Sequence, residues 1–118
     1  MSNAGLFIEW GATVTGRESK ALEVFGEAMN LYEHYERDGE IDSYEVVLLS
    51  PHGNGLSGYA LLRGSAEQCA SVRGRDDFQR VLARAGLVVD HLGVVDATLG
   101  EGIPDQMAVY TEAIGAVA

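Results

Sequence analysis

Residues 44–64, YEVVLLSPHGNGLSGYALLRG, constrain the fold of this chain more than any other stretch. Two runs within it, residues 44–49 and 59–62, consist mainly of the β-branched, aromatic and aliphatic side chains that favour strands. Between the runs, Pro51 and the glycines Gly53 and Gly55 cannot continue a hydrogen-bonded ladder. The stretch therefore predicts an antiparallel hairpin whose loop is longer than the two-residue kind.

Both faces of this hairpin are apolar. A symmetric loop predicts two sets of facing residues, Leu48 with Tyr59 and Val46 with Leu61 on one side, and Val47 with Ala60 and Leu49 with Gly58 on the other. A hairpin with one face in water alternates apolar and polar residues, so something must cover each face here. The helices of so short a chain suffice for one face. We therefore expect a second copy of the protein on the other.

The remaining sequence predicts two more strands and four helical segments. Residues 5–10 are typical of a first strand, and residues 17–37 repeat apolar positions every three or four residues until Gly39 ends the helix. Ser65 and Gln68 form a capping box for a second helix, which Gly74 divides from a further piece at 76–85. Residues 87–96 predict a long final strand. Pro104 suits the start of a terminal helix, whose apolar row is Met107, Tyr110 or Thr111, Ile114 and Val117.

Composition narrows the class of protein. The 118 residues suffice for one domain with its own core, spanning residues 1–118. Eighteen acidic residues against eight basic ones give a formal charge of −10, which disfavours nucleic acid and anionic membranes as partners. No apolar run is long enough to cross a bilayer, and no basic segment marks a signal peptide. The single cysteine, Cys69, is expected to be an inert core thiol rather than a nucleophile. A lone cysteine fits a reducing compartment, and with no signal peptide we expect a cytoplasmic protein.

The order strand, helix, strand, strand, helix, strand is the ferredoxin-like pattern, an α+β fold with an antiparallel sheet in the order 4-1-3-2 and its long helices on one face. With an apolar bare face, the chain resembles the dimeric α+β barrel family, in which two copies press their sheets together. The stretches that carry this resemblance are residues 44–64, the DDF helix start at 76–78 and LVVDHLGVVDATLG at 87–100. The resemblance covers residues 5–100 and leaves the terminal helix as an addition.

The resemblance implies a pocket for a small molecule between the sheet and the helices of each subunit. The family includes cofactor-independent oxygenases, lactone isomerases and haem-dependent enzymes, so it implies no single reaction. The oxygenase pattern of Asn, Trp and His on fixed elements is not reproduced, because Asn30 and Asn54 have no matching place. No catalytic residue is therefore carried over.

His91 is the main candidate for proton transfer. It is predicted to lie within the apolar final strand, sharing a face with Leu87, Val89 and Val95, and histidine is the side chain suited to proton transfer near neutral pH. Glu9, on the neighbouring strand, is predicted within reach of it or opposite. Catalytic roles are thus assigned to His91 and Glu9. The alternative is a histidine bound to a backbone carbonyl in a dimer interface.

Four residues are candidates for substrate binding: Trp10, Tyr59, Arg63 and His52. Tyr59 and Arg63 share one face of the third strand, where they suit a phenolate or a carboxylate. Alternatively, Tyr59 belongs to the core and Arg63 pairs with a surface acid. Trp10 ends the first strand, and His52 lies in the hairpin loop, where it would guard a pocket mouth.

Two other residue sets carry weaker signals. The small residues Gly58 and Ala60 open space on the second face of their strand, either for a cavity or for close helix packing. His34 lies among acidic residues, but no three ligands converge and no HExxH or CxxC motif is present, so a solvated acidic surface is expected and no metal. No cofactor is predicted, and haem is a weaker alternative.

The sequence thus predicts a small homodimeric barrel that binds a modest, largely apolar organic molecule. Metal-free oxygenation or isomerisation would suit such a site. The alternative is a non-catalytic binding or dimerisation module. An enclosed pocket beside His91, Tyr59 or Trp10 favours the first interpretation, and a solidly packed interior favours the second. Whether the terminal helix stays on its own subunit or crosses to the mate is left open.

Overall fold

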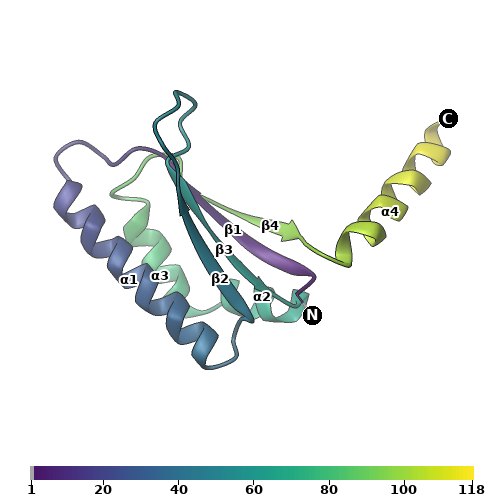
Figure 1. Ribbon diagram of the computed structural model, residues 1–118, viewed down its shortest axis with the longest axis horizontal. Coiled ribbons are helices and arrows are strands. Elements are labelled where there is room, and N and C mark those ends of the chain that lie inside the picture. Colours follow the sequence, from purple (N-terminus) through teal and green to yellow (C-terminus); the bar gives the residue numbers. More distant parts are fainter. Residues whose placement is uncertain (1) are drawn as a thin grey trace.

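The structure is a computed structural model that describes residues 2–118. Within these residues, four strands and four helices follow one another (Figure 1). They are β1 (Ala4–Trp10), α1 (Glu18–Arg37), β2 (Ser43–Leu48), β3 (Gly58–Gly64), α2 (Ala66–Arg73), α3 (Asp76–Ala85), β4 (Gly93–Thr98) and α4 (Gly102–Val117). The predicted order of elements is confirmed.

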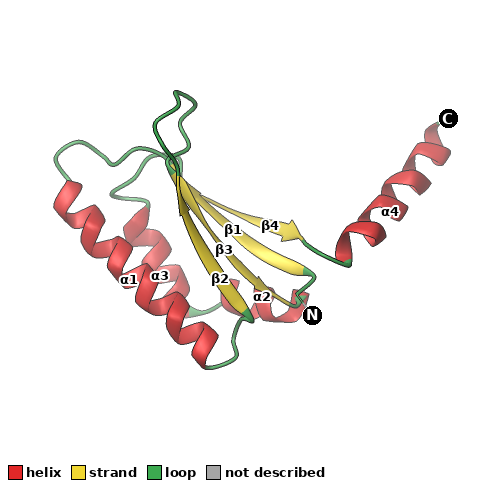
Figure 2. Ribbon diagram, in the orientation of Figure 1, coloured by secondary structure: helices red, strands yellow, loops and turns green. Residues whose placement is uncertain are grey.

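The strands form one antiparallel sheet in the order β2-β3-β1-β4, as predicted. Figure 2 shows α1 and α3 side by side against one face of this sheet, with α2 across one end of it. The predicted capping box begins α2: Ser65 N donates to Gln68 Oε1 at 2.7 Å, and Gln68 N donates to Ser65 Oγ at 3.0 Å. The fold is therefore the ferredoxin-like α+β arrangement.

The hairpin register differs by one residue from the symmetric prediction. Val46 lies opposite Ala60, and Val47 lies opposite Tyr59. Residues 49–57 form the loop, in which Gly53 (φ 86°) and Gly55 (φ 81°) both adopt the left-handed conformation. A slip of one residue exchanges the faces of a strand relative to its neighbour. Val46 therefore faces the helices, and Val47 shares the open face with Tyr59.

The final strand is shorter than predicted, because β4 begins only at Gly93. The backbone of His91 is left-handed (φ 58°), a conformation that interrupts a strand and that histidine tolerates better than most residues. Pairing resumes beyond the break, where Thr13 bridges Val89 in the register that extends the β1–β4 ladder. The placement of His91 within a strand was therefore wrong: it occupies a kink between two paired segments.

The helix-covered face of the sheet carries the core. Leu6, Ile8, Ala60 and Leu62 project from the central strands and are at most 3% exposed. Residues of the three covering helices complete the core; these are Tyr32, Tyr35, Cys69, Val72 and Phe78, together with Ile41 before β2. Cys69 lies in this core as the sequence predicted. Burial raises the pKa of its thiol, and the charges of Asp96 and Asp42 add to the effect, so the thiol is unreactive.

The opposite face is largely apolar, apart from Glu9, Glu45 and Arg63, and none of the helices described in residues 2–118 covers it within one subunit (Figure 2). Strand alternation places Phe7, Val47, Tyr59, Leu61 and Val95 on it. The rings of Phe7 and Tyr59 lie 4.9 Å apart, centroid to centroid, and Val95 is 48% exposed. A contiguous apolar surface of this kind marks an interaction site more often than a solvated face.

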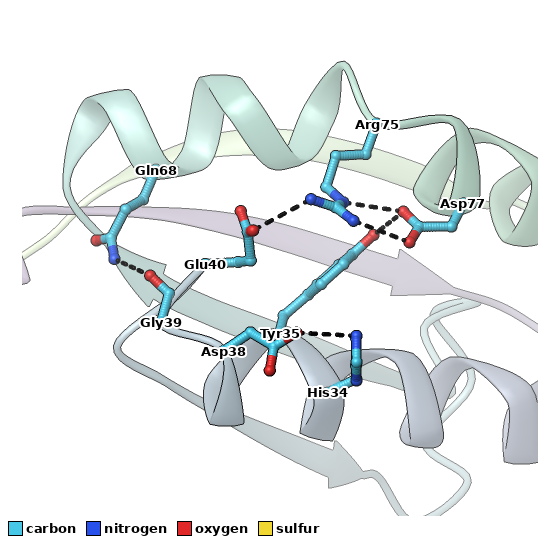
Figure 3. Close-up of polar contacts among 8 residues, drawn as sticks. All are labelled: His34, Tyr35, Asp38, Gly39, Glu40, Gln68, Arg75 and Asp77. Atoms are coloured by element: carbon cyan, nitrogen blue, oxygen red, sulfur yellow. Dashed lines mark hydrogen bonds and ion pairs between the residues drawn. The ribbon is translucent and has the colours of Figure 1, made fainter.

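A polar cluster fixes the end of α1 against the α2–α3 junction (Figure 3). The Tyr35 hydroxyl donates to Asp77 Oδ1 at 2.5 Å, and the Arg75 guanidinium bonds the same carboxylate at 3.1 and 3.3 Å and reaches Glu40 at 3.2 Å. The hydrogen bond from Arg75 lowers the pKa of Asp77, whereas burial and the Asp77 contact raise the pKa of Tyr35. The cluster thereby holds α1 and α3 in one relative position.

Candidate ligand cavity

A cavity of about 480 Å³ lies between the sheet and the helices α1 and α3. Its walls are almost entirely aliphatic and aromatic. They include Ile8, Trp10, Val24, Phe25, Ala28, Met29, Tyr32, Val46, Leu48, Ala60, Val81, Leu82, Ala85, Val88, Val89 and Leu92. This volume falls in the range of small-molecule sites. The predicted location of the pocket, between sheet and helices, agrees with this geometry.

Small side chains explain why the interior is open. Ala60 on β3, Ala28 on α1 and Ala85 on α3 all line the cavity, and their methyl groups leave space that larger side chains would fill. At the end of β3, Gly58 lies against the ring of Trp10: a Cβ there would approach Trp10 Cζ2 to 2.8 Å. Of the two outcomes that the sequence left open, Ala60 lies at a cavity, whereas Gly58 does not line it and allows the Trp10 ring to pack closely.

Two aromatic side chains bring polar atoms to these walls. Tyr32 lines the cavity from α1 and is 4% exposed, and burial raises the pKa of its phenol to about 12. The hydroxyl therefore stays protonated at neutral pH. Among the described residues, no protein group bonds the Tyr32 hydroxyl or the Trp10 indole nitrogen, and no buried side-chain polar atom lacks a partner, so solvent reaches both atoms. Both are free to bond a polar group of a ligand.

The cavity opens at the end of the sheet that carries the 49–57 loop and the connection from β1 to α1. Leu22 and Leu48 line it, and they are 75% and 69% exposed. Thr13, Glu18 and Ser57 contribute the polar part of this rim. The arrangement suits a ligand whose apolar body enters the interior and whose polar end stays near solvent.

His91 lies beside this rim rather than in the walls. Its side chain is exposed, while its neighbours Val89 and Leu92 line the cavity. Gly11, another wall residue, is packed so closely that a Cβ would lie 3.3 Å from His91 Cδ2 and 2.7 Å from the Gly55 carbonyl oxygen. Among the described residues no hydrogen bond or ion pair joins His91 to Glu9. Glu9 projects from the open face of the sheet, opposite Gly93 and Tyr59.

Of the other sequence candidates, Trp10 alone lines the cavity. Tyr59 and Arg63 share a face of β3, as predicted, but that is the open face. Arg63 Nη2 bonds Glu45 Oε1 at 2.6 Å across the hairpin, which matches the alternative of pairing with a surface acid. His52 is exposed in the loop, and its Nδ1 lies 2.9 Å from the Ser50 carbonyl oxygen.

Tyr32 is the cavity residue that sequence reasoning missed. It lies in the apolar stripe of α1, where a tyrosine is indistinguishable by spacing from a purely structural core residue. Two features of the sequence together could have identified it: a tyrosine, which carries a hydroxyl, in the core-facing stripe of a helix, and the small residue Ala60 on the strand that the helix covers.

Within residues 2–118, no group of three metal-ligating side chains is arranged to hold an ion. His34 instead pairs with Asp38 on the same helix, with Nε2 and Oδ2 3.0 Å apart (Figure 3). None of the helices in this part of the chain combines the length and apolar character needed to span a bilayer.

Comparison with known proteins establishes the fold. No family model and no curated protein matches the sequence. Solved structures match throughout the body of the chain. A dimeric ferredoxin-like protein of unknown function from Thermobifida fusca has a TM-score of 0.62 at 13% identity, over 84% of this chain and 93% of that one. A dimeric protein of unknown function and ferredoxin-like fold from Bacteroides fragilis has a TM-score of 0.60 at 11% identity, over 81% and 96%.

A third structure carries a functional description. It is from Caulobacter crescentus and is provisionally described as an antibiotic biosynthesis monooxygenase, with a TM-score of 0.59 at 14% identity over 85% of this chain and 92% of that one. Identities this low show the shared fold alone. The predicted ferredoxin-like resemblance is confirmed at that level, and two of these three neighbours are dimeric.

Proposed function

We propose that the protein is a homodimer in which each subunit binds one small, largely apolar organic molecule between sheet and helices. The observation that carries this proposal is the apolar cavity of about 480 Å³, whose lining includes Tyr32 and Trp10, two side chains that can donate a hydrogen bond. A ligand with an aromatic or alicyclic body and one hydrogen-bonding oxygen fits these features. The dimeric neighbours and the uncovered apolar sheet face support the homodimer.

Ligand binding is tested by filling the cavity. Ala28→Phe places a ring in the cavity wall, and Ala83→Phe, on the exposed side of α3, is the matched control. The probe is N-phenyl-1-naphthylamine, a neutral dye whose emission rises in apolar surroundings. We expect saturable binding of one dye per subunit by the wild type and Ala83→Phe, and its loss in Ala28→Phe. Equal binding by all three proteins would contradict the proposal.

His91 remains our proposed proton-transfer residue, acting at the cavity rim. The motive is its position beside Gly11 and the mouth, and its left-handed backbone, a strained conformation that clusters at functional sites. Glu9, on the other side of the sheet, is proposed to act only if a second subunit covers that face. Metal-free oxygenation and isomerisation are the reactions that we would assay first, in line with the monooxygenase description of one neighbour.

The test of His91 uses asparagine, which also tolerates the left-handed backbone. His91→Asn should abolish turnover of candidate aromatic substrates without lowering thermal stability, whereas His34→Asn, on the exposed side of α1 where it pairs with Asp38, should leave turnover unchanged. Substrate turnover that survives His91→Asn would remove the catalytic role. Dye binding without any turnover would favour the non-catalytic binding module.

A further inference from the structure

Helix α4 stands clear of the body of the molecule (Figure 1). No residue of this helix is buried, and among the described elements only β4 makes appreciable contact with it. Figure 2 shows it projecting from the side of the sheet opposite to α1 and α3. An isolated helix of 16 residues is only marginally stable in water. Helices in proteins gain most of their stability by packing an apolar side against another element, and α4 has no such element among the described residues of its own chain.

Apart from Val109, the large apolar residues of α4 form a narrow seam. They are Ile103, Met107, Tyr110, Ile114 and Val117, which are 48%, 55%, 64%, 50% and 87% exposed. Their spacing alternates between four and three residues, the period of a coiled-coil seam rather than of a broad core-facing stripe. A seam of this width is complementary to one partner helix.

The charges of α4 lie away from this seam. In heptad terms the seam residues occupy positions a and d, and the two acids, Asp105 and Glu112, both fall at position f on the opposite side. The flanking e and g positions hold Pro104, Gln106, Thr111 and Ala113, all uncharged. Two such helices can therefore meet without like-charge repulsion at their contact. The helix carries no basic residue, unlike helices that lie on anionic membranes.

The connection to β4 holds the helix in this direction. Leu99 N donates to the Asn3 carbonyl at 2.9 Å, and Gly102 N donates to the Leu99 carbonyl at 2.9 Å. Gly100 takes the left-handed conformation (φ 50°), and a Cβ on Gly102 would approach Asn3 O to 2.9 Å. The turn is thus ordered and tightly packed against the chain start, and it directs α4 outward.

We propose that α4 is a self-association arm that pairs with α4 of a second copy of this chain through the seam. The seam is self-complementary in period and lacks charge, and α1, α2 and α3 already use their apolar sides within the body. Two heptads alone give a weak contact. Linkage to a folded body that itself associates raises the effective concentration of the arms.

The pairing is tested in the full-length protein by seam substitutions. The double variant Met107→Glu with Ile114→Glu places carboxylates at two a positions of the seam. The control is Val109→Glu, which introduces a carboxylate at a position that is 60% exposed and lies outside the seam. The self-association constant from sedimentation equilibrium should fall at least about a hundredfold in the double variant, since each charge costs more than the ~1.4 kcal/mol of a tenfold change. Val109→Glu should match the wild type. Equal constants for the double variant and the wild type would overturn the proposal.

Cysteine cross-linking identifies the partner surface. Tyr110→Cys lies at the centre of the seam, where parallel and antiparallel pairs both bring the two thiols together, and Glu112→Cys lies at position f. In glutathione buffer, Tyr110→Cys should form severalfold more disulfide-linked dimer than Glu112→Cys. Equal cross-linking would overturn the α4 pair. So would flotation of the wild type, but not of the seam variant, with neutral phosphatidylcholine vesicles, which would assign the seam to lipid.

Discussion

Single glycines set the shape of the cavity. Gly58 lies where the Trp10 ring crosses β3, and a Cβ at this position would approach Trp10 Cζ2 to 2.8 Å and the Val47 carbonyl oxygen to 2.7 Å. The carbonyl belongs to the backbone of the neighbouring strand and cannot easily move. The absence of a side chain at Gly58 therefore determines where the indole sits, and the indole forms one end of the cavity.

Substituting this glycine should be costly. Gly58→Ala is expected to lower the free energy of unfolding by about 1–3 kcal/mol, as overpacking does in tightly filled sites. The matched control is Gly26→Ala in α1, where an added Cβ meets no atom within 4 Å. That change should stabilise the protein by about 0.5–1 kcal/mol through helix propensity. Urea unfolding of the three proteins measures both effects, and a neutral Gly58→Ala would contradict the packing argument.

At the scale of elements, the polar cluster that joins α1 to α3 makes stability depend on pH. The pKa of Asp77 is lowered in the folded protein, chiefly by the hydrogen bond from Arg75. A carboxylate with a lowered folded pKa contributes stability that is complete above its unfolded value, about 3.9, and is lost as the pH falls through the folded value. The contact between α1 and α3 should therefore weaken only in acid.

The corresponding variant is Asp77→Asn. At pH 7 we expect it to be less stable than the wild type by roughly 1 kcal/mol, because the partners are partly exposed. Below about pH 4 the difference should shrink, since the wild-type carboxylate then becomes protonated. Thermal unfolding between pH 2 and 7 gives the comparison. A constant difference across this range would show that the charge of Asp77 does not contribute.

The order and type of the elements could be predicted from the sequence, because each has a local signal. The capping box of Ser65 and Gln68 and the terminating Gly39 both appear as expected. The register of the hairpin could not be predicted, because composition does not show whether Leu48 or Leu49 pairs with Gly58, and the two choices differ by one residue in loop length. The kink at His91 left no signal either: residues 87–96 have strand composition on both sides of it, and only the fold shows that pairing stops there.

The cavity was predictable in location but not in its lining. Its location followed from the resemblance to the dimeric α+β barrel family. Its lining depends on which residues of the helices face Ala60, and the spacing of apolar residues along a helix does not identify those positions. Trp10 was named and lines the wall, and Tyr32 was not named. Tyr59 and Arg63 were named for a face that turned out to be the uncovered one. The sequence could not decide this, because both faces of β3 carry apolar residues and its alternation does not show which face the helices cover.

For the whole molecule, the uncovered sheet face leads to a test of dimerisation. Leu61→Glu places a carboxylate in the middle of this face, next to Phe7, and should convert the proposed dimer into a monomer at micromolar concentration. Leu87→Glu, at a position 64% exposed and outside the sheet, is the control that should leave the mass unchanged. Sedimentation velocity gives the masses. A wild-type chain that remains a well-folded monomer would rule out the dimer.

The protein contains a single tryptophan, and it is the residue at the end of the cavity. Its indole contacts the ring of Phe25, with centroids 6.1 Å apart. Intrinsic fluorescence excited at the indole band therefore comes from one place in each chain, with no background from elsewhere. Compound libraries can be screened against the unlabelled protein by following the emission wavelength and quenching of Trp10, so the chain carries its own optical sensor for whatever enters its interior.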